Sequence, residues 1–279
     1  MVMKKKYEKF IIDPSKLIDK LSNNKIRLID CRWYLENIRK GKEEYLKNHI
    51  PGAIFFDIEK NSDDSKEIPH MIPKTNQFYK YLNFNNITKK NSIIIYDQNG
   101  FFCSARVWFI FKLFGFKNVK ILNGGYKLWK KKKLITTFDF KENKLNDTKI
   151  DIQKNRKLIA SKKYLEKNLK KKKKLIIDAR PEERFLGIIA EPRKNLKKGK
   201  IEGSINIPFN TFVNENGEFR NLKYVKELLD KKINFLNVKE IICSCGSGIT
   251  ACNIILALNL IGFHNIKLYD GSWAEWGKK

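Results

Sequence analysis

The sequence has few of the residues that build small disulfide-bonded, metal-binding or membrane-spanning proteins. Five cysteines and three histidines are spread over 279 residues. Cysteines this sparse do not make the disulfide framework of a small secreted domain, and they form no paired Cys-x2-Cys motifs for zinc. No stretch approaches the ~20 apolar residues of a membrane span. We therefore expect a globular protein of a reducing compartment, with no metal and no membrane partner.

The first residues, MVMKKKYEKFIIDP, are basic. Their apolar run is too short for a secretory signal, and they lack the Arg- and Ser-rich amphipathic pattern of a transit peptide. We expect a cytoplasmic location from these features.

Basic residues far outnumber acidic ones, which gives a formal net charge of +28. Such a charge invites a nucleic-acid interpretation. The excess is almost entirely lysine, however, and lysine is accompanied by many asparagines and isoleucines, as a coding bias would produce. The runs at 130–134 and 171–176 have no interleaved aromatic residues and no recognisable binding motif. We interpret them as solvated surface and expect no specific nucleic-acid partner, which leaves a general preference for anions as the alternative.

The chain repeats itself at an almost constant offset. A Ser-initiated helical pattern followed by an apolar strand ending in Asp occurs at 15–32 and again at 161–180. Asp30 and Asp178, which end those strands, are 148 residues apart. The stretches 105–129 and 251–276 share a helix, a Gly-Phe stop, a strand and a Gly-turn-Trp. This constancy predicts two copies of one structural unit.

Each copy alternates short β-branched apolar runs with helical patterns, which is typical of a parallel sheet covered by helices on both faces. The sequence therefore predicts an α/β protein of two doubly wound domains, residues 1–135 and 158–279, joined by a polar linker at 136–157. The predicted strands comprise residues 26–30, 92–96, 118–122, 174–178, 239–244 and 266–269.

One segment of this lysine-rich chain carries no charge: CSCGSGIT, residues 243–250. It follows a predicted buried strand and precedes a buried helix closed by Gly262, so it is a loop at the carboxyl edge of the sheet, where ligands of such folds bind. A lone cysteine is more often an ordinary core residue. Here the loop's backbone N–H groups and the helix start favour a thiolate at Cys245, and Gly246 and Gly248 permit the required backbone angles. The equivalent loop of the first copy has Asp97 or Gln98 instead of a cysteine.

This loop resembles the tandem-domain sulfurtransferases of the rhodanese fold, and so do six further stretches: LIDCRWYL, HIPGAIFFDIE, PHMIP, ERFLG, EPR and GSINIPF. The resemblance implies two tandem rhodanese-like domains. Within that family, CGSGIT and YDGSWAEW are similar to the 3-mercaptopyruvate sulfurtransferase branch. The resemblance covers nearly the whole chain and implies an enzyme that needs no cofactor. It implies that sulfur passes from 3-mercaptopyruvate through a persulfide to a thiol acceptor such as thioredoxin or a small thiol, or to cyanide.

The resemblance also implies roles for individual residues. Cys245 is the nucleophile, surrounded by N–H groups of the loop. Arg184 and Arg193 match the family's two substrate arginines, and without the motif they would be two among 58 basic residues. The residues implied for proton transfer are Ser247, His70 and Glu59, the last at a position that is often Asp. The loop residues implied around the substrate are Gly246, Gly248, Ile249 and Thr250.

Three other functions compete with this interpretation. A thiosulfate sulfurtransferase usually has charged residues inside the loop, and this loop has none. A cysteine phosphatase of similar fold requires an arginine six residues after the cysteine, where this chain has Ala251. A non-catalytic interaction module would be favoured by loss of the thiol, which is present. Cys243, Cys252 and Cys31 are expected to be buried structural thiols, and His264 an exposed loop residue.

Overall fold

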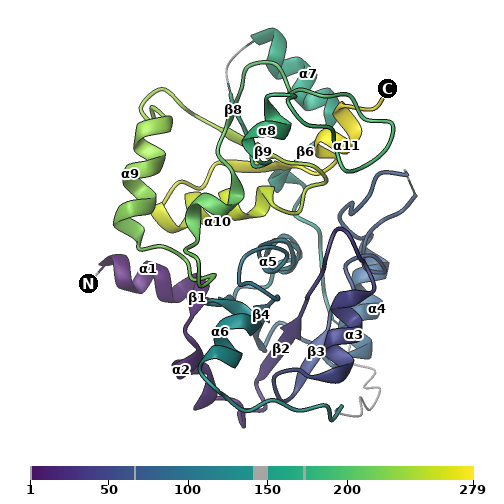
Figure 1. The fold of residues 1–279 in the computed structure, drawn as a ribbon, viewed down its shortest axis with the longest axis vertical. Coiled ribbons are helices and arrows are strands. Elements are labelled where there is room, and N and C mark those ends of the chain that lie inside the picture. Colours follow the sequence, from purple (N-terminus) through teal and green to yellow (C-terminus); the bar gives the residue numbers. More distant parts are fainter. Residues whose placement is uncertain (1, 66, 141–149, 172–173) are drawn as a thin grey trace. The chain divides into compact units, whose positions relative to one another are not determined.

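A computed structural model describes residues 2–65, 67–140, 150–171 and 174–279 (Figure 1). Two compact units divide the chain. Unit 1 comprises residues 1–62, 72–155 and 213–219, and unit 2 comprises 63–71, 156–212 and 220–279. Residues 141–149 of the expected linker and 172–173 of the second basic run lie outside the described residues.

Unit 1 is built on a five-stranded sheet with the order β1-β5-β4-β2-β3, and every pair is parallel. Its strands are β1 (Ile11–Ile12), β2 (Ile26–Asp30), β3 (Ala53–Phe55), β4 (Ser92–Tyr96) and β5 (Val119–Leu122). The central strand β4 reads SIIIY and is buried along almost its whole length. Both faces of such a strand need cover, which explains why its sequence does not alternate with polar residues.

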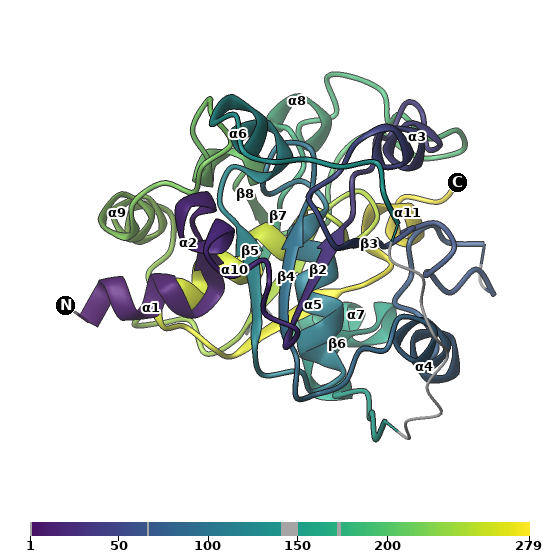
Figure 2. The same ribbon diagram turned by 90° about the horizontal axis from the view of Figure 1, so that it is seen from below.

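Helices supply that cover in unit 1. They are α1 (Val2–Phe10), α2 (Pro14–Ile18), α3 (Lys40–Lys47), α4 (Thr75–Phe84), α5 (Ser104–Leu113) and α6 (Gly125–Lys131). One core cluster joins Leu17 of α2, Tyr45 of α3 and Trp129 of α6 to the strands. The helix α5 packs on β4 and β5 on the opposite face, beside α4 (Figure 2).

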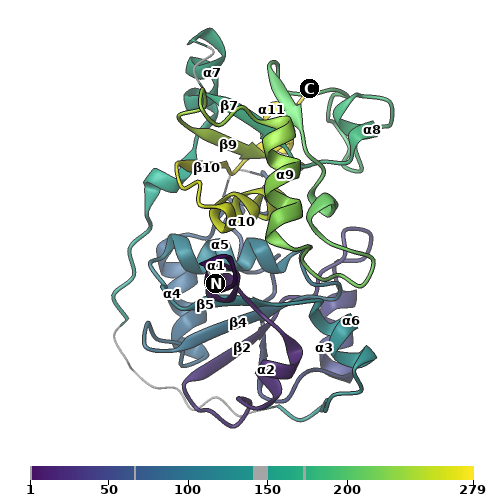
Figure 3. The ribbon, with the colours of Figure 1, turned by 90° about the vertical axis from the view of Figure 1, so that its left-hand side faces the viewer.

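Unit 2 repeats this plan with the strand order β6-β10-β9-β7-β8, again all parallel. Its strands are β6 (Ile159–Ala160), β7 (Leu175–Asp178), β8 (Ser204–Asn206), β9 (Ile241–Ser244) and β10 (Ile266–Tyr269). Its helices are α7 (Lys162–Lys171), α8 (Glu182–Phe185), α9 (Leu222–Lys232), α10 (Ala251–Ile261) and α11 (Ser272–Trp276), with short 3-10 turns η1 (Arg156–Leu158) and η2 (Phe209–Phe212). Residues of α7 and α11 share a core cluster with the sheet, whereas α10 packs on β9 and β10 together with α9 (Figure 3).

The predicted α/β fold is confirmed, and so are the six predicted strands, with ends that differ by at most two residues. The strands β1 and β6, which lie at one edge of each sheet, were not predicted. Each has only two residues, too few to show a pattern, and each is defined by pairing with β5 or β10. None of the helices among the described residues is long and apolar enough to cross a membrane.

Each unit also contains a short segment from the other half of the chain. Residues 63–71 come from the first half and belong to unit 2, where Asp63 and Met71 form an antiparallel bridge. Residues 213–219 come from the second half and belong to unit 1, where Val213 and Phe219 pair in the same way. The first of these segments carries His70 into unit 2.

Candidate active site

The loop after β9 lies where the connections of the unit 2 sheet change direction. The strands β7 and β9 are parallel neighbours, and Asp178 at the end of β7 is in register with Ser244 at the end of β9. The chain proceeds from β7 to β8 on one side, and from β9 to β10 on the other. Ligands of open α/β sheets bind at this point, beyond the carboxyl ends of the two diverging strands. Cys245 is the first residue after β9.

The backbone at Cys245 is held by the segment that follows β10. The N–H of Cys245 donates to Ser272 Oγ at 3.1 Å, and its carbonyl accepts from the N–H of Trp273 at 2.9 Å. The carbonyl of Gly246 accepts from the N–H of Ala274 at 2.8 Å. With a residue exposure of only 2%, Cys245 is accessible through a narrow opening at most. The three hydrogen bonds therefore fix the backbone that carries the Cys245 thiol.

Unit 1 contains the same loop with a carboxylate in place of the thiol. Asp97, 148 residues before Cys245, is fully buried. Its two oxygens accept from five backbone N–H groups at 2.5–3.0 Å, those of Asn99, Gly100, Phe102, Cys103 and Ser104. Gly100 and its equivalent Gly248 both have positive φ, 106° and 78°, which glycine adopts readily. This loop conformation therefore makes a nest of donors suited to an anion.

In unit 2 the equivalent positions run from Ser247 to Cys252, and Cys245 occupies the position that Asp97 has in unit 1. Ile249 is buried beside it, and Thr250 is the N-cap residue of α10. Backbone donors of such a loop and the start of a helix stabilise negative charge on a group that is held there. The arrangement can therefore hold an anion.

His70 meets this loop through Ser247. Its Nδ1 lies 2.9 Å from Ser247 Oγ and 3.4 Å from Arg193 Nη2, and both His70 and Ser247 are buried. A guanidinium only donates hydrogen bonds, so the lone pair of Nδ1 faces Arg193 and Ser247. With Nδ1 as the acceptor, the Ser247 hydroxyl is the donor of this hydrogen bond. His70 can accordingly take a proton from Ser247 or return one.

The two arginines predicted from the sequence both approach Gly246. A Cβ at that position would lie 3.0 Å from Arg184 Nη2 and 4.0 Å from Arg193 Nη1. A side chain at this position would displace the Arg184 guanidinium by a few tenths of an ångström, so glycine favours its close approach. The Nε of Arg184 is buried and has no hydrogen-bond partner among the described residues. Buried donors are usually satisfied, so this group is available to a bound anion.

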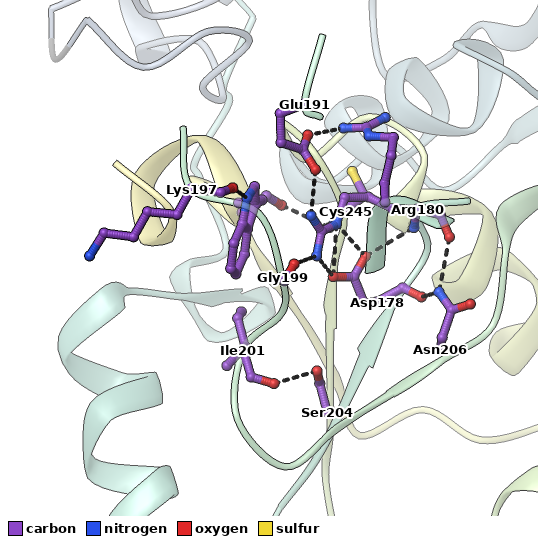
Figure 4. A network of polar contacts seen from close by, with 12 residues as sticks. Asp178, Arg180, Glu191, Lys197, Gly199, Ile201, Ser204, Asn206 and Cys245 are labelled. Atoms are coloured by element: carbon purple, nitrogen blue, oxygen red, sulfur yellow. Dashed lines mark hydrogen bonds and ion pairs between the residues drawn. The ribbon is translucent and has the colours of Figure 1, made fainter. Parts of the chain in front are cut away.

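Glu191 holds Arg184 in place, and the sequence analysis did not identify it. Its carboxylate, whose side chain is 2% exposed, accepts from Arg184 Nη2 on one oxygen and from Arg180 Nη1 at 2.6 Å on the other. Arg180 in turn pairs with Asp178 at 2.7 Å and stacks on the Trp273 ring (Figure 4). The only signal in the sequence was its place in EPR, two residues before Arg193.

Glu59 lies in unit 1, in the turn that follows β3. The indole Nε1 of Trp33 donates to Glu59 Oε1 at 2.7 Å. Glu59 therefore belongs to unit 1. The other implied site residues all belong to unit 2, and they are Cys245, Ser247, His70, Arg184, Arg193, Gly246, Gly248, Ile249 and Thr250.

The remaining cysteines differ from Cys245 in their surroundings. All five are free and buried. Burial raises the pKa of the Cys243 thiol well above its ordinary value, and the nearby Cys252 and Cys245 add to the effect. Burial likewise raises the pKa of Cys31, next to Cys103. Cys243 and Cys31 are therefore protonated and inert at neutral pH. His264 is exposed, as expected.

No cluster of three or more His, Cys, Asp or Glu side chains suited to a metal ion occurs within the described ranges. The described side chains of this site could support a reaction of their own. The sulfur of Cys245 can act as a nucleophile, the two guanidinium groups can bind an anionic substrate, and the hydrogen-bonded serine and histidine can move a proton.

Comparison with known proteins agrees with this chemistry. The model of the rhodanese-like domain matches residues 13–132 and 161–279. The 3-mercaptopyruvate sulfurtransferase of Mus musculus is 33% identical over 91% of this chain and 86% of its own length. The thiosulfate sulfurtransferase of Bos taurus is 34% identical over 90% of this chain and 84% of its own. Among solved structures, the 3-mercaptopyruvate sulfurtransferase SseA from Escherichia coli superposes with a TM-score of 0.85, at 31% identity, over 95% of this chain and 98% of that one.

Proposed function

Because the chain belongs to the rhodanese-like family and is a sulfurtransferase, we propose that it moves the sulfur of 3-mercaptopyruvate through a persulfide on Cys245 to a thiol or to cyanide. The observation that carries this choice of donor is where the positive charge lies. The loop 246–250 is uncharged, and the nearby cations are Arg184 and Arg193, beside Gly246.

The first step is attack of the Cys245 thiolate on the sulfur of 3-mercaptopyruvate. A sulfur–sulfur bond forms, the carbon–sulfur bond breaks, and its electron pair becomes the enolate of pyruvate. Negative charge therefore develops on the ketone oxygen, several atoms from Cys245. A guanidinium at that oxygen stabilises the transition state more than the ground state. Arg184 and Arg193 are suited to this role because their forked donors match a carboxylate and an adjacent carbonyl.

Proton transfer completes the half-reaction. The enolate needs a proton at carbon to become pyruvate. Ser247 and His70 are hydrogen-bonded to each other beside the loop, so the imidazole can take up the proton that the donor's thiol loses and return it through the Ser247 hydroxyl to the enolate carbon. We assign Glu59 to the same relay on the strength of the family resemblance. The substrate-binding roles of Gly246, Gly248, Ile249 and Thr250 are proposed on the same basis.

The local charge balance favours a donor with one negative charge. Arg180, Arg184 and Arg193 carry three positive charges, and Asp178 and Glu191 carry two negative ones. The Cys245 thiolate that attacks the donor adds a third negative charge, so the site has no surplus positive charge for the second charge of thiosulfate, and the single carboxylate of 3-mercaptopyruvate fits it better. Thiosulfate is the second candidate donor because a thiosulfate sulfurtransferase is among the relatives of similar identity.

Steady-state kinetics with both donors and cyanide as the common acceptor tests the proposal. We expect kcat/KM for 3-mercaptopyruvate to exceed that for thiosulfate by about a hundredfold, equivalent to about 2.7 kcal/mol of differential transition-state stabilisation. In Arg184→Ala, kcat/KM for 3-mercaptopyruvate should fall by a factor that corresponds to about 2 to 4 kcal/mol of lost transition-state stabilisation, as when one partner of a charged hydrogen bond is removed. Comparable efficiencies for the two donors, or an Arg184→Ala enzyme that loses only thiosulfate activity, would contradict it.

A further inference from the structure

An apolar surface lies next to the candidate active site. Between Arg184 and Arg193 the chain makes a short excursion, LGIIA, which we call the 186–190 loop. Leu186, Ile188 and Ile189 expose 51%, 63% and 47% of their surface. The arginines that flank the loop on both sides extend their guanidinium groups to Gly246, the residue after Cys245. The 186–190 loop therefore joins two residues of the candidate active site.

The 186–190 loop is held rigidly in this exposed position. The N–H groups of Ile188 and Ile189 both donate to the carbonyl of Glu183, at 2.9 and 3.3 Å. The ammonium of Lys198 donates to the carbonyl of Ile188 at 3.2 Å. A loop with satisfied backbone groups loses little conformational entropy when another surface covers it. Exposed apolar side chains on a rigid support are typical of an interaction site.

The charge around the loop indicates the kind of partner. Lys194, Lys197, Lys198 and Lys200 are exposed on the segment that packs beside it, whereas Glu182 and Glu183 are the exposed acidic residues on its other side. Basic residues therefore predominate locally, as they do in the whole chain, with its net charge of +28. A second copy would carry the same charge and be repelled, whereas an acidic partner would be attracted.

We propose that the 186–190 loop is the docking surface for a protein sulfur acceptor, a small acidic protein with an apolar surface around its reactive thiol. This inference rests on the proposed function for the existence of the Cys245 persulfide. Because Cys245 is only 2% exposed, a protein thiol reaches the sulfur only when its surface packs closely around the opening. The apolar loop supplies that packing, and the lysines orient the approach.

The transfer step is balanced without any further reagent. The acceptor thiolate attacks the outer sulfur of the persulfide, and a new sulfur–sulfur bond forms on the acceptor. The bond to Cys245 breaks, and Cys245 leaves as a thiolate. In an acceptor with two thiols, the second thiolate displaces hydrosulfide and closes a disulfide. The dithiol supplies the two electrons, and hydrosulfide release reports the transfer.

The test measures this second half-reaction alone. Enzyme is loaded with sulfur by 3-mercaptopyruvate or, if that donor fails, by thiosulfate, and is then freed of donor and mixed with reduced thioredoxin or with cyanide. Failure to load with 3-mercaptopyruvate would count against the proposed donor and leave the docking test intact. The variant is Ile188→Ser combined with Ile189→Ser, and its matched control is Leu236→Ser, which removes a side chain of unit 2 that is 96% exposed.

We expect the double variant to transfer sulfur to thioredoxin at least tenfold more slowly and to cyanide within twofold of the wild-type rate, and the control to change neither rate. In Lys194→Glu, the thioredoxin rate alone should fall several-fold and lose much of its dependence on salt. An unchanged thioredoxin rate in the double variant overturns the proposal, as does an equal loss with both acceptors. A double variant that loses only self-association, or only binding to phosphatidylserine vesicles, also overturns it.

Discussion

Five thiols share this chain, and all of them are buried, so burial alone does not distinguish the nucleophile. The difference lies in what surrounds each sulfur. Cys245 follows a strand and begins a loop of the kind that, in unit 1, gives five backbone donors to Asp97. Cys243, two residues earlier, lies within β9, where burial raises the pKa of its thiol. The two sulfurs should therefore behave very differently towards the same donor.

Mass spectrometry should locate the persulfide. After incubation with 3-mercaptopyruvate and no acceptor, the peptide that contains Cys245 should gain one sulfur atom. In Cys245→Ser, both this adduct and turnover should disappear, because no other thiol has the donor-lined loop. Cys243→Ser is the matched control and should keep most activity. Sulfur found on Cys103 or Cys31 would refute the assignment of the nucleophile.

Glu191 gives a second prediction at the scale of a residue. In Glu191→Gln, Arg184 loses its charged partner and is no longer fixed towards Gly246. We expect the KM for 3-mercaptopyruvate to rise about tenfold, which corresponds to about 1.4 kcal/mol. Transfer from the preloaded enzyme to cyanide should change by less than twofold, because that step does not use the donor carboxylate.

Folding must be separated from positioning in this experiment. Glu191→Ala leaves Arg184 without a carboxylate partner and Arg180 with Asp178 alone, and should unfold at a lower temperature, because breaking a buried pair costs about 3 to 5 kcal/mol. Glu191→Asp retains the charge and should recover part of the donor affinity. If Gln, Ala and Asp variants all fall equally in both half-reactions, Glu191 supports the fold only.

At the scale of elements, the two strand–loop–helix segments β4–α5 and β9–α10 are versions of one structure with different occupants. In unit 1 the carboxylate of Asp97 fills the donor nest permanently. In unit 2 the corresponding position is that of Cys245, whose sulfur changes charge during the turnover that we propose. The same backbone thus serves stability in one unit and chemistry in the other.

Replacing Asp97 tests this comparison. Asp97→Ala leaves five buried N–H groups without their acceptor, and each unsatisfied group costs about 1 to 3 kcal/mol before relaxation and water entry. We expect the unfolding transition of unit 1 to lose at least about 3 kcal/mol in urea. Asp97→Asn keeps one acceptor oxygen and should lose about half as much. A transition unaltered by Asp97→Ala would show that the nest is not a significant anion site.

The elements themselves were largely predictable from the sequence. Apolar runs such as IRLID and SIIIY identified the strands, and the fixed offset between Asp30 and Asp178 identified the duplication. The strands β1 and β6 could not be found, because two residues carry no periodicity and their pairing with β5 and β10 is a tertiary effect. Glu191 was overlooked for a similar reason, since an acidic residue gives no sign in the sequence that two arginines will enclose it.

At the scale of the whole molecule, the charge of +28 and the position of the arginines have separate consequences. The surface lysines create a diffuse attraction for anions, whereas Arg180, Arg184 and Arg193 are partly or fully enclosed and bound to defined partners. Ions in solution screen the first kind of interaction strongly and the second much less.

Binding to duplex DNA distinguishes these two contributions. We expect weak binding at low salt that disappears at physiological ionic strength, because contacts between lysines and phosphates are lost as counterions compete. Fluorescence anisotropy with a labelled duplex, over a range of salt concentrations, would measure it. Tight binding that persists at physiological salt would revive a nucleic-acid function for the basic surface.

The location of residues 63–71 in unit 2 and of 213–219 in unit 1 has a consequence for any attempt to dissect the gene. A cut at the polar connection, the natural choice for separate expression, removes His70 from the fragment that carries Cys245. That fragment would have a nucleophile but no imidazole hydrogen-bonded to Ser247. Activity would return only when the complementary fragment was co-expressed, so the two sequence repeats are not two independent functional units.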